Sequence, residues 1–300
     1  MYNTRMSRFA LLLSLAAMAN AVAAPVDIDT AAQLYQAAAI REQVRASLGS
    51  MPAHIRKLFQ GNTSAPLSDT QLTAVNVAAV RAFRIDVFEA PALSAFASNL
   101  DAETVKKAET FLASDTGKRW VAADVGLASL SDEDADKIMN GDMTAAATPQ
   151  RTVLFEKLER AERSSESTIQ ILLTMGTAVA LGTAVGSGME PGPVEERARK
   201  SGEASRQTLE DNMREPMRRY VAYGYRDLSD ADLKHVLSFL QSTAGKQYIS
   251  AYMASLDAGF HAMGRRCGEQ LGESLRELAM AQLATEHVDP APPAIAKPHP

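Results

Sequence analysis

The chain has 300 residues, a formal net charge of −5 and a single cysteine, and 46% of its residues are apolar. An acidic chain lacks the excess of lysine and arginine that neutralises phosphates, so we exclude nucleic acid as a partner. One cysteine cannot close a disulfide within a chain. Burial of apolar side chains must therefore stabilise the fold, as one large domain or as two of ordinary size.

The first 24 residues have the features of a secretory signal peptide. Arg5 and Arg8 provide a positive start, residues 9–18 form an apolar run of ten, and small residues follow. Ten apolar residues are too few to span a bilayer. We expect cleavage after Ala23 or Ala24, and a periplasmic or secreted protein.

The stretches that follow have the 3.6-residue period of α-helices, and none alternates with period two for long enough to predict a strand. We therefore predict an all-α fold. The first helix is expected at 31–48, with Asp29 or Thr30 as its N-cap. A long helical segment at 68–99 is expected to be interrupted by Pro91.

The second half repeats this plan after a boundary at 141–149. A long helix is expected from about Val194, and Pro216 interrupts it as Pro91 interrupts the first. A stripe with spacings of four, three, four and four residues predicts one further helix before it. The stripe consists of Leu154, Leu158, Ala161, Ser165 and Ile169.

Residues 100–120 and 228–248 are two versions of one sequence. At an offset of 128, seven of the 21 positions are identical, where composition alone gives about one. Two such units indicate a duplicated domain rather than a repeat array. We predict two diverged copies of a helical module that pack into one body across a pseudo-two-fold axis, with any binding site at their junction. The faces expected to meet there consist of Phe83, Val87, Phe88, Leu93 and Phe96 in copy one and Leu209, Met213, Met217 and Tyr220 in copy two.

The repeat condenses to Phe-Leu-x-Ser-x-x-Gly-Lys followed by an aromatic residue, and it predicts a corner between two helices. Ser229 and Asp232 resemble a capping box, and each motif serine can cap the helix that follows it. Each motif glycine suits either a left-handed helix end or a close backbone approach. The motif residues are Phe111, Ser114, Gly117, Lys118 and Trp120 in copy one and Phe239, Ser242, Gly245, Lys246 and Tyr248 in copy two.

This motif, after a Ser-Asp-x-Asp-Leu helix start, resembles a family of exported proteobacterial helical domains of unknown function. The resemblance is good over 227–256 and partial over 93–127, where Asp101-Ala102 replaces the Ser-Asp start. It implies a small helical fold and export through a signal peptide. It implies no catalytic residue.

Residues 168–189 form an uncharged stretch of 22 residues that contains Gly182-x-x-x-Gly186. This length can span a bilayer, and small residues let helices approach closely. Threonines, a glutamine and four glycines dilute its apolar character. We therefore expect a buried core helix, and keep an inner-membrane span as the alternative.

No set of residues with catalytic or metal-binding spacing is present. The five histidines form no His-x-x-x-His pair, and a Cys-x-x-Cys pair needs more than one cysteine. Because capping explains Ser114 and Ser242, we assign no nucleophile, and we expect no catalytic residue, cofactor or metal. Cys267 is interpreted as a buried small residue, with a reactive thiol or an intermolecular bridge left open.

The predicted organisation is a signal peptide (1–24), copy one (25–147), copy two (148–287) and a disordered Pro-rich tail (288–300). The function we expect is a non-catalytic binding or structural role in the bacterial cell envelope. The partner would be an envelope protein or a small ligand, and a homo-oligomer is left open. The alternatives are a periplasmic hydrolase with its site between the copies and a membrane-anchored protein.

Overall fold

The computed structural model describes residues 26–61 and 67–286. The expected signal peptide and Pro-rich tail lie outside these residues. The described residues contain helices and no strand, which confirms the all-α class. In chain order the helices are α1 (Ile28–Ala37), α2 (Ile40–Leu48), α3 (Met51–Gly61), α4 (Asp69–Ala82), α5 (Ile85–Ser98), α6 (Ala102–Ala113), α7 (Asp115–Ala128), α8 (Asp132–Asn140), α9 (Pro149–Glu162), α10 (Ser164–Gly186), α11 (Pro191–Gly224), α12 (Asp230–Gln241) and α13 (Thr243–Glu286).

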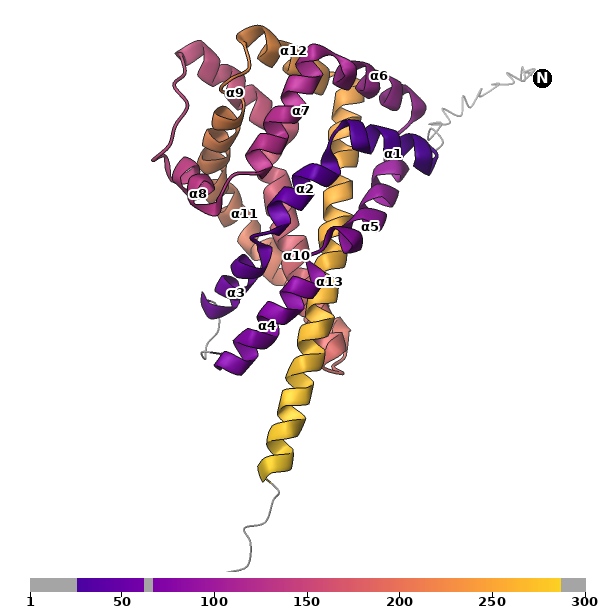
Figure 1. The fold of residues 1–300 in the computed structure, drawn as a ribbon, viewed down its shortest axis with the longest axis vertical. Coiled ribbons are helices and arrows are strands. Elements are labelled where there is room, and N and C mark those ends of the chain that lie inside the picture. Colours follow the sequence, from indigo (N-terminus) through magenta and orange to yellow (C-terminus); the bar gives the residue numbers. More distant parts are fainter. Residues whose placement is uncertain (1–25, 62–66, 287–300) are drawn as a thin grey trace, which may run out of the picture.

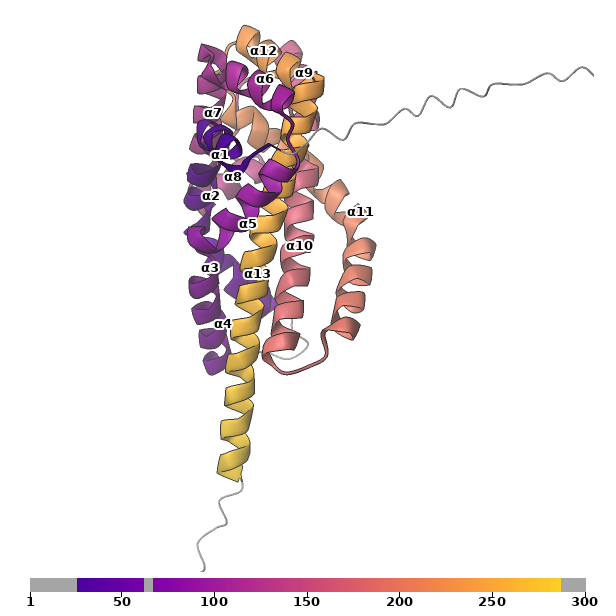
Figure 2. The ribbon, with the colours of Figure 1, turned by 90° about the vertical axis from the view of Figure 1, so that its right-hand side faces the viewer.

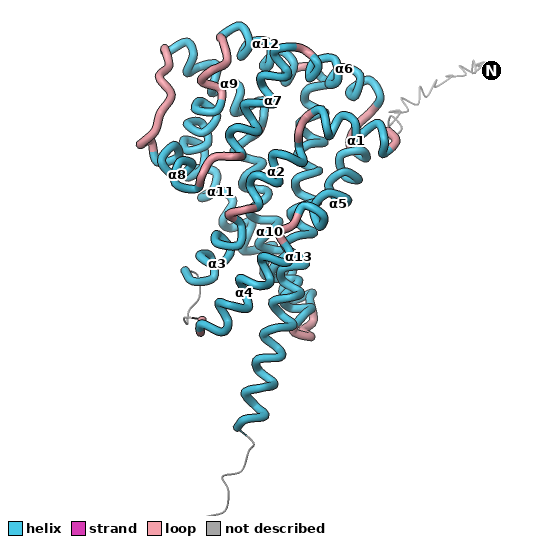
Figure 3. The backbone as a smooth tube through the Cα atoms, viewed as in Figure 1, coloured by secondary structure: helices cyan, strands magenta, loops and turns pink. Residues whose placement is uncertain are grey.

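The long helix α13 is the axis of the molecule (Figure 1). Its 44 residues extend over about 66 Å. Helices α4, α5, α6 and α10 pack along it, so elements from both halves of the sequence share it as a neighbour. Most connections between helices are short, and the segment between α8 and α9 is a longer loop (Figure 3).

Helix α10 runs parallel to α13 and in backbone contact with it (Figure 2). A Cβ atom added at Gly182 would lie 2.2 Å from the carbonyl oxygen of Arg265, and one added at Gly268 would lie 2.1 Å from that of Val179. Any side chain at either position would push the helices apart. Helix α13 supplies Gly264-x-x-x-Gly268-x-x-x-Gly272, a spacing that matches the expected pair on α10.

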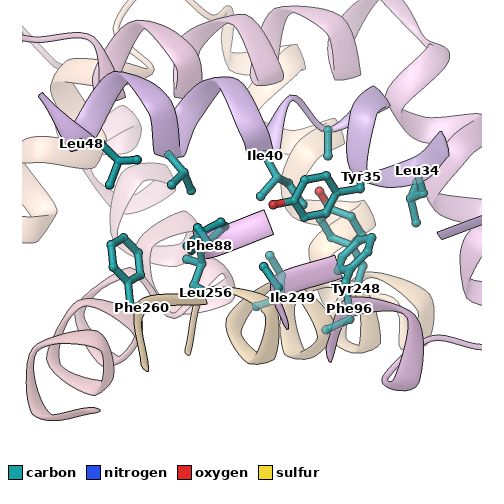
Figure 4. Packing of buried hydrophobic residues seen from close by; sticks show 14 of the residues in the cluster. Leu34, Tyr35, Ile40, Leu48, Phe88, Phe96, Tyr248, Ile249, Leu256 and Phe260 are labelled. Atoms are coloured by element: carbon teal, nitrogen blue, oxygen red, sulfur yellow. The ribbon is translucent and has the colours of Figure 1, made fainter. Parts of the chain in front are cut away.

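One hydrophobic cluster joins the two halves (Figure 4). Phe88 of α5 contacts Phe260 of α13 edge to face, with ring centroids 5.3 Å apart, and Phe96 contacts Tyr248 at 6.2 Å. Phe88 and Phe96 are fully buried. The same cluster contains residues from α1 to α13, so the halves form one body.

The first predicted helix is in fact two. Ala39 has a left-handed backbone with φ of 51°, which separates α1 from α2. The N-cap is Asp27, whose carboxylate accepts a hydrogen bond from the Thr30 backbone at 2.9 Å, and not Asp29 or Thr30. The apolar period continues across the break, which is why the sequence pattern did not reveal it.

The prediction that the two prolines interrupt helices was wrong. Pro91 lies inside α5 and Pro216 inside α11. A proline inside a helix removes one hydrogen bond at a cost of about 3 kcal/mol. In α5, burial of Phe88 before Pro91 and of Phe96 after it offsets that cost, because both rings pack on α13. The interruption in 68–99 occurs instead at Phe83 and Arg84, between α4 and α5.

The expected stripe from Leu154 to Ile169 also belongs to two helices, separated at Arg163 with φ of 58°. Leu158 and Ile169 are both fully buried. Helix α10 is buried on one face only, since Leu172 and Val185 are 43% and 40% exposed. It is therefore a helix as expected, but other helices do not surround it.

The stretch formed by α9 and α10, Pro149–Gly186, is the one described segment with the length and composition of a membrane span. Its most apolar window has a mean hydropathy of 1.6, and 39% of that window is buried within the protein. A core helix of a soluble protein can have the same length and composition. The alternative of a membrane anchor is therefore kept.

Candidate ligand-binding site

The two motif serines cap the helices that follow them. Ser114 Oγ accepts a hydrogen bond from the Gly117 N–H at 3.0 Å, and Ser242 Oγ accepts one from the Gly245 N–H at 3.0 Å. A Cβ added at Gly117 or Gly245 would lie 2.1 or 2.0 Å from a carbonyl oxygen of the preceding helix. The close-approach interpretation of these glycines is therefore confirmed. The left-handed interpretation is wrong, since neither has a positive φ.

The two corners meet each other at their aromatic residues. Phe111 and Phe239 stack with ring centroids 4.1 Å apart and planes inclined by 8°. Trp120 and Tyr248 are buried beside them. Lys118 and Lys246 are exposed. The repeated apolar residues thus form the contact between the two corners, and the repeated lysines do not.

Polar contacts between the corners are reciprocal. Thr104 of α6 donates a hydrogen bond to Gln247 of α13 at 3.0 Å, while Arg119 of α7 forms an ion pair with Asp232 of α12. Thr104 and Asp232 are equivalent positions at the offset of 128, and so are Arg119 and Gln247. Each copy therefore contributes the same two positions to these contacts. Hydrogen bonds from Ser229, Arg119 and Thr116 hold the pKa of the Asp232 carboxyl well below its usual value.

A cavity of about 430 Å³ lies beside this junction. Copy one contributes α7 and the α1–α2 region to its wall, and copy two contributes α10, α11 and α13. The wall is mainly apolar, with side chains such as Ile171, Met175, Leu256 and Phe260. A cavity of this size and character is typical of small-molecule sites. The prediction of a site at the junction therefore has a physical counterpart.

Four polar side chains meet at one side of the cavity, and we call them the Asp124–Glu162 cluster. They are Trp120 and Asp124 of α7, Glu162 of α9 and Tyr225, which follows α11. The Tyr225 hydroxyl lies 2.6 Å from Asp124 Oδ1 and 2.7 Å from Glu162 Oε1. The Trp120 Nε1–H donates to Glu162 Oε1 at 3.1 Å and to the Tyr225 oxygen at 3.0 Å.

The geometry of this cluster requires a shared proton. A tyrosine hydroxyl has one proton to donate, and a carboxylate can only accept. Tyr225 can therefore donate to one carboxyl group and must accept from the other, so one of the two acids is protonated. Burial and the Glu162 charge raise the pKa of Asp124 well above its usual value, and burial raises the pKa of Glu162 to about 7. Both shifts favour the protonated form of each acid.

The cavity wall contains these two acids and no lysine, arginine or histidine. A second cavity of about 530 Å³ has the opposite charge, with Lys157, Arg160, Arg163 and Lys246 and no acid in its wall. Within the described ranges, no group of three or more histidine, cysteine, aspartate or glutamate side chains has a metal-binding arrangement. Cys267 is buried in the core, and burial raises the pKa of its thiol to about 12.

No protein-family model, curated protein or solved structure matches this chain. The resemblance to an exported family of unknown function therefore stays a prediction.

Sequence reasoning identified Trp120 but missed Asp124, Glu162 and Tyr225. These residues have no common spacing, because they come from three separate elements of the fold. A weak signal existed: Asp124 lies four residues after Trp120 on the same helix face, opposite the charged side of α7. An acid on the buried face of a helix is uncommon and usually has a partner.

Proposed function

We propose that this chain is a small-molecule-binding protein of the bacterial cell envelope whose site is the junction cavity. One observation carries the proposal: a largely apolar cavity of about 430 Å³ with one polar cluster in its wall. Apolar walls provide affinity, and a few convergent polar groups select the ligand and orient it. The signal peptide expected at 1–24 supports the envelope location.

We further infer that the two halves arose by duplication. The identical positions at an offset of 128, the two equivalent capped corners and the reciprocal Thr104–Gln247 and Asp232–Arg119 contacts support this. Where two duplicated halves are related by a two-fold axis, they contact each other along that axis. The cavity lies beside this contact, between α7 of one half and α10–α11 of the other.

The binding proposal is tested by titration with a neutral fluorophore that brightens in apolar surroundings, such as N-phenyl-1-naphthylamine. We expect saturable binding with one site per chain. Ser167→Trp and Ala128→Trp each place a large side chain in the cavity wall and should abolish this binding. Ser238→Trp on the exposed face of α12 is the matched control and should leave it unchanged.

Circular dichroism melts of the three variants show whether each remains folded. Absence of saturable binding to the wild-type protein would contradict the proposal. Binding that survives both filling substitutions would place the fluorophore elsewhere and would also contradict it.

The acid pair favours a hydrolase as the second candidate function. Two carboxyl groups that share a proton serve as acid and base in several hydrolase classes. Here the Tyr225 hydroxyl occupies the position between them where such enzymes activate a water molecule, so binding is better supported. Turnover of nitrophenyl esters or glycosides by the wild-type protein, and its loss in Glu162→Gln, would instead establish the hydrolase.

A further inference from the structure

The charge of the junction cavity indicates which ligands it selects. We propose that it binds an organic cation, an ammonium group on an apolar body, with the ammonium group at the carboxyls of Asp124 and Glu162. The inference rests on the proposed function, because it names the ligand class of that same cavity.

The two acids lack the positive partner that the acids bridging other helices have. Asp232 pairs with Arg119, Asp230 with Arg151 and Glu156 with Arg218. An acid removed from water without a cation loses solvation that hydrogen bonds only partly replace. Tyr225 and Trp120 provide those hydrogen bonds and no charge.

Among the residues that the structure describes, no neighbouring element supplies a cation to the cavity wall either. The titratable groups around the pair are Glu159 of α9, Tyr220 of α11 and Tyr248 and Tyr252 of α13. The α2 side of the wall provides Gln43 and Ser47, and α10 provides Ser164, Ser167 and Thr168. At neutral pH all of these groups are uncharged or negative. A bound ammonium group would be the one positive charge at the cluster.

The aromatic side chains of the wall suit the same ligand class. Trp120, Tyr220, Tyr248 and Tyr252 line the cavity together with the acids. Aromatic rings attract cations, more strongly where water is excluded. A carboxylate or phosphate ligand would instead add a negative charge beside two acids. A neutral ligand would use the apolar wall and gain nothing from the charge.

Cation binding is coupled to the shared proton. When the ammonium group arrives, the protonated carboxyl can release its proton to solvent, and both carboxylates then face the ligand. Each binding event thus takes up one ammonium ion and releases up to one proton to the solvent. The preference for a cation should therefore increase as pH rises through neutrality, as long as the amine itself stays protonated.

The test is isothermal titration calorimetry of the full mature chain with 1-octylamine, 1-octanol and octanoate, which share one apolar body. At pH 8.5 we expect octylamine to bind at least about tenfold more tightly than octanol, and octanoate to bind more weakly than octanol. At pH 5.5 the preference for octylamine should shrink. Titrations at pH 7 in two buffers of different ionisation enthalpy should show proton release with octylamine and none with octanol.

Neutral variants test the residues. The double variant Asp124→Asn, Glu162→Gln keeps polar groups of the same size, and should lose the preference for octylamine over octanol. Asp257→Asn is the control, since Asp257 accepts hydrogen bonds from Thr174 and Gln170 outside the cavity wall. It should keep that preference.

The outcomes separate the two proposals. If octanol binds and octylamine binds no more tightly, the cation inference is wrong and the binding function stands. A preference that survives in the double variant also overturns the inference. If none of the three compounds nor the neutral fluorophore binds, the proposed function itself is wrong.

Discussion

At the scale of single residues, the Asp124–Glu162 cluster places two acids without a cation beside a largely apolar cavity. Its acids are held where burial and mutual repulsion oppose ionisation. A group whose pKa is higher in the folded state than in the unfolded state binds its proton more tightly when folded. Its contribution to stability is present at low pH and is lost as the pH rises through the folded-state pKa.

The first prediction concerns this pH dependence. The pKa of Glu162 is raised to about 7 from a usual value of 4.5, so its stabilising protonation is lost between those pH values. We expect Glu162 to lower the free energy of unfolding by about 2 kcal/mol between pH 5 and pH 7. Urea unfolding at both pH values measures this. Glu162→Gln should reduce the wild-type difference by about that amount, with the remainder due to Asp124. An equal pH dependence in wild type and variant would contradict the assignment.

The second prediction concerns the motif glycines. Gly245→Ala should destabilise the protein by about 1–3 kcal/mol, because the new Cβ would lie 2.0 Å from the Phe239 carbonyl oxygen and the corner would have to open. Gly176→Ala is the control: nothing lies within 4 Å of a Cβ there, and alanine favours a helix interior. Thermal melts of the two variants measure this effect, and similar melting temperatures would disprove the close approach.

At the scale of elements, the sequence predicted helices better than it predicted their ends. The capped corner starting at Ser229 was predictable because capping is a local interaction between Ser229 and Asp232. The breaks at Ala39 and Arg163 were not, since an alanine or arginine with a left-handed backbone leaves no local signature. Side-chain hydrogen bonds accompany both breaks, from Gln43 to the Ala38 carbonyl and from Ser165 to Glu159.

Helix α10 illustrates the same limit. Its composition fits a membrane span and a core helix equally, and the structure adds that it packs closely on α13. Gly264, Gly268 and Gly272 of α13 carry the matching glycine spacing. Two stretches with glycine every fourth residue are visible in the sequence, and their common spacing is a signal that α10 and α13 pack on each other.

The third prediction tests the one-sided burial of α10. Ile169→Asp should prevent folding or cause aggregation, because Ile169 is fully buried and an aspartate there would have no partner. Leu172→Asp, three residues away and 43% exposed, should yield a soluble, folded protein. Solubility and circular dichroism of the two variants measure this. If the wild-type protein resists carbonate extraction from membranes, α10 is an anchor instead.

At the scale of the whole molecule, the predicted single body is present and the expected surfaces of contact are only partly correct. Phe83, Phe88 and Phe96 of copy one are buried as expected, but Phe88 and Phe96 pack with α1 and α13. Of the residues expected opposite them, Met217 is buried and lines the cavity, while Leu209 and Met213 are half-buried. The halves meet mainly where α5 and α4 pack on α13, and the repeated corners add a smaller contact. The sequence offset indicated that the corners are equivalent, but it could not place them in space.

The fourth prediction follows from the shared cluster of buried side chains. Fragments 25–147 and 148–300, expressed separately, should not fold as stable monomers, because α4, α5 and α6 would lack α13. Mixing them should restore helical structure and a cooperative melt. Two fragments that fold alone and ignore each other when mixed would contradict the single-body description.

The position of α13 in the sequence has a consequence for biogenesis. Ribosomes make the chain from the N-terminus, so α13 is made after the helices α4, α5, α6 and α10 that pack on it. Folding that depends on contacts of such long sequence separation cannot finish before α13 is available. The nascent protein thus lacks a complete tertiary structure until α13 has left the ribosome.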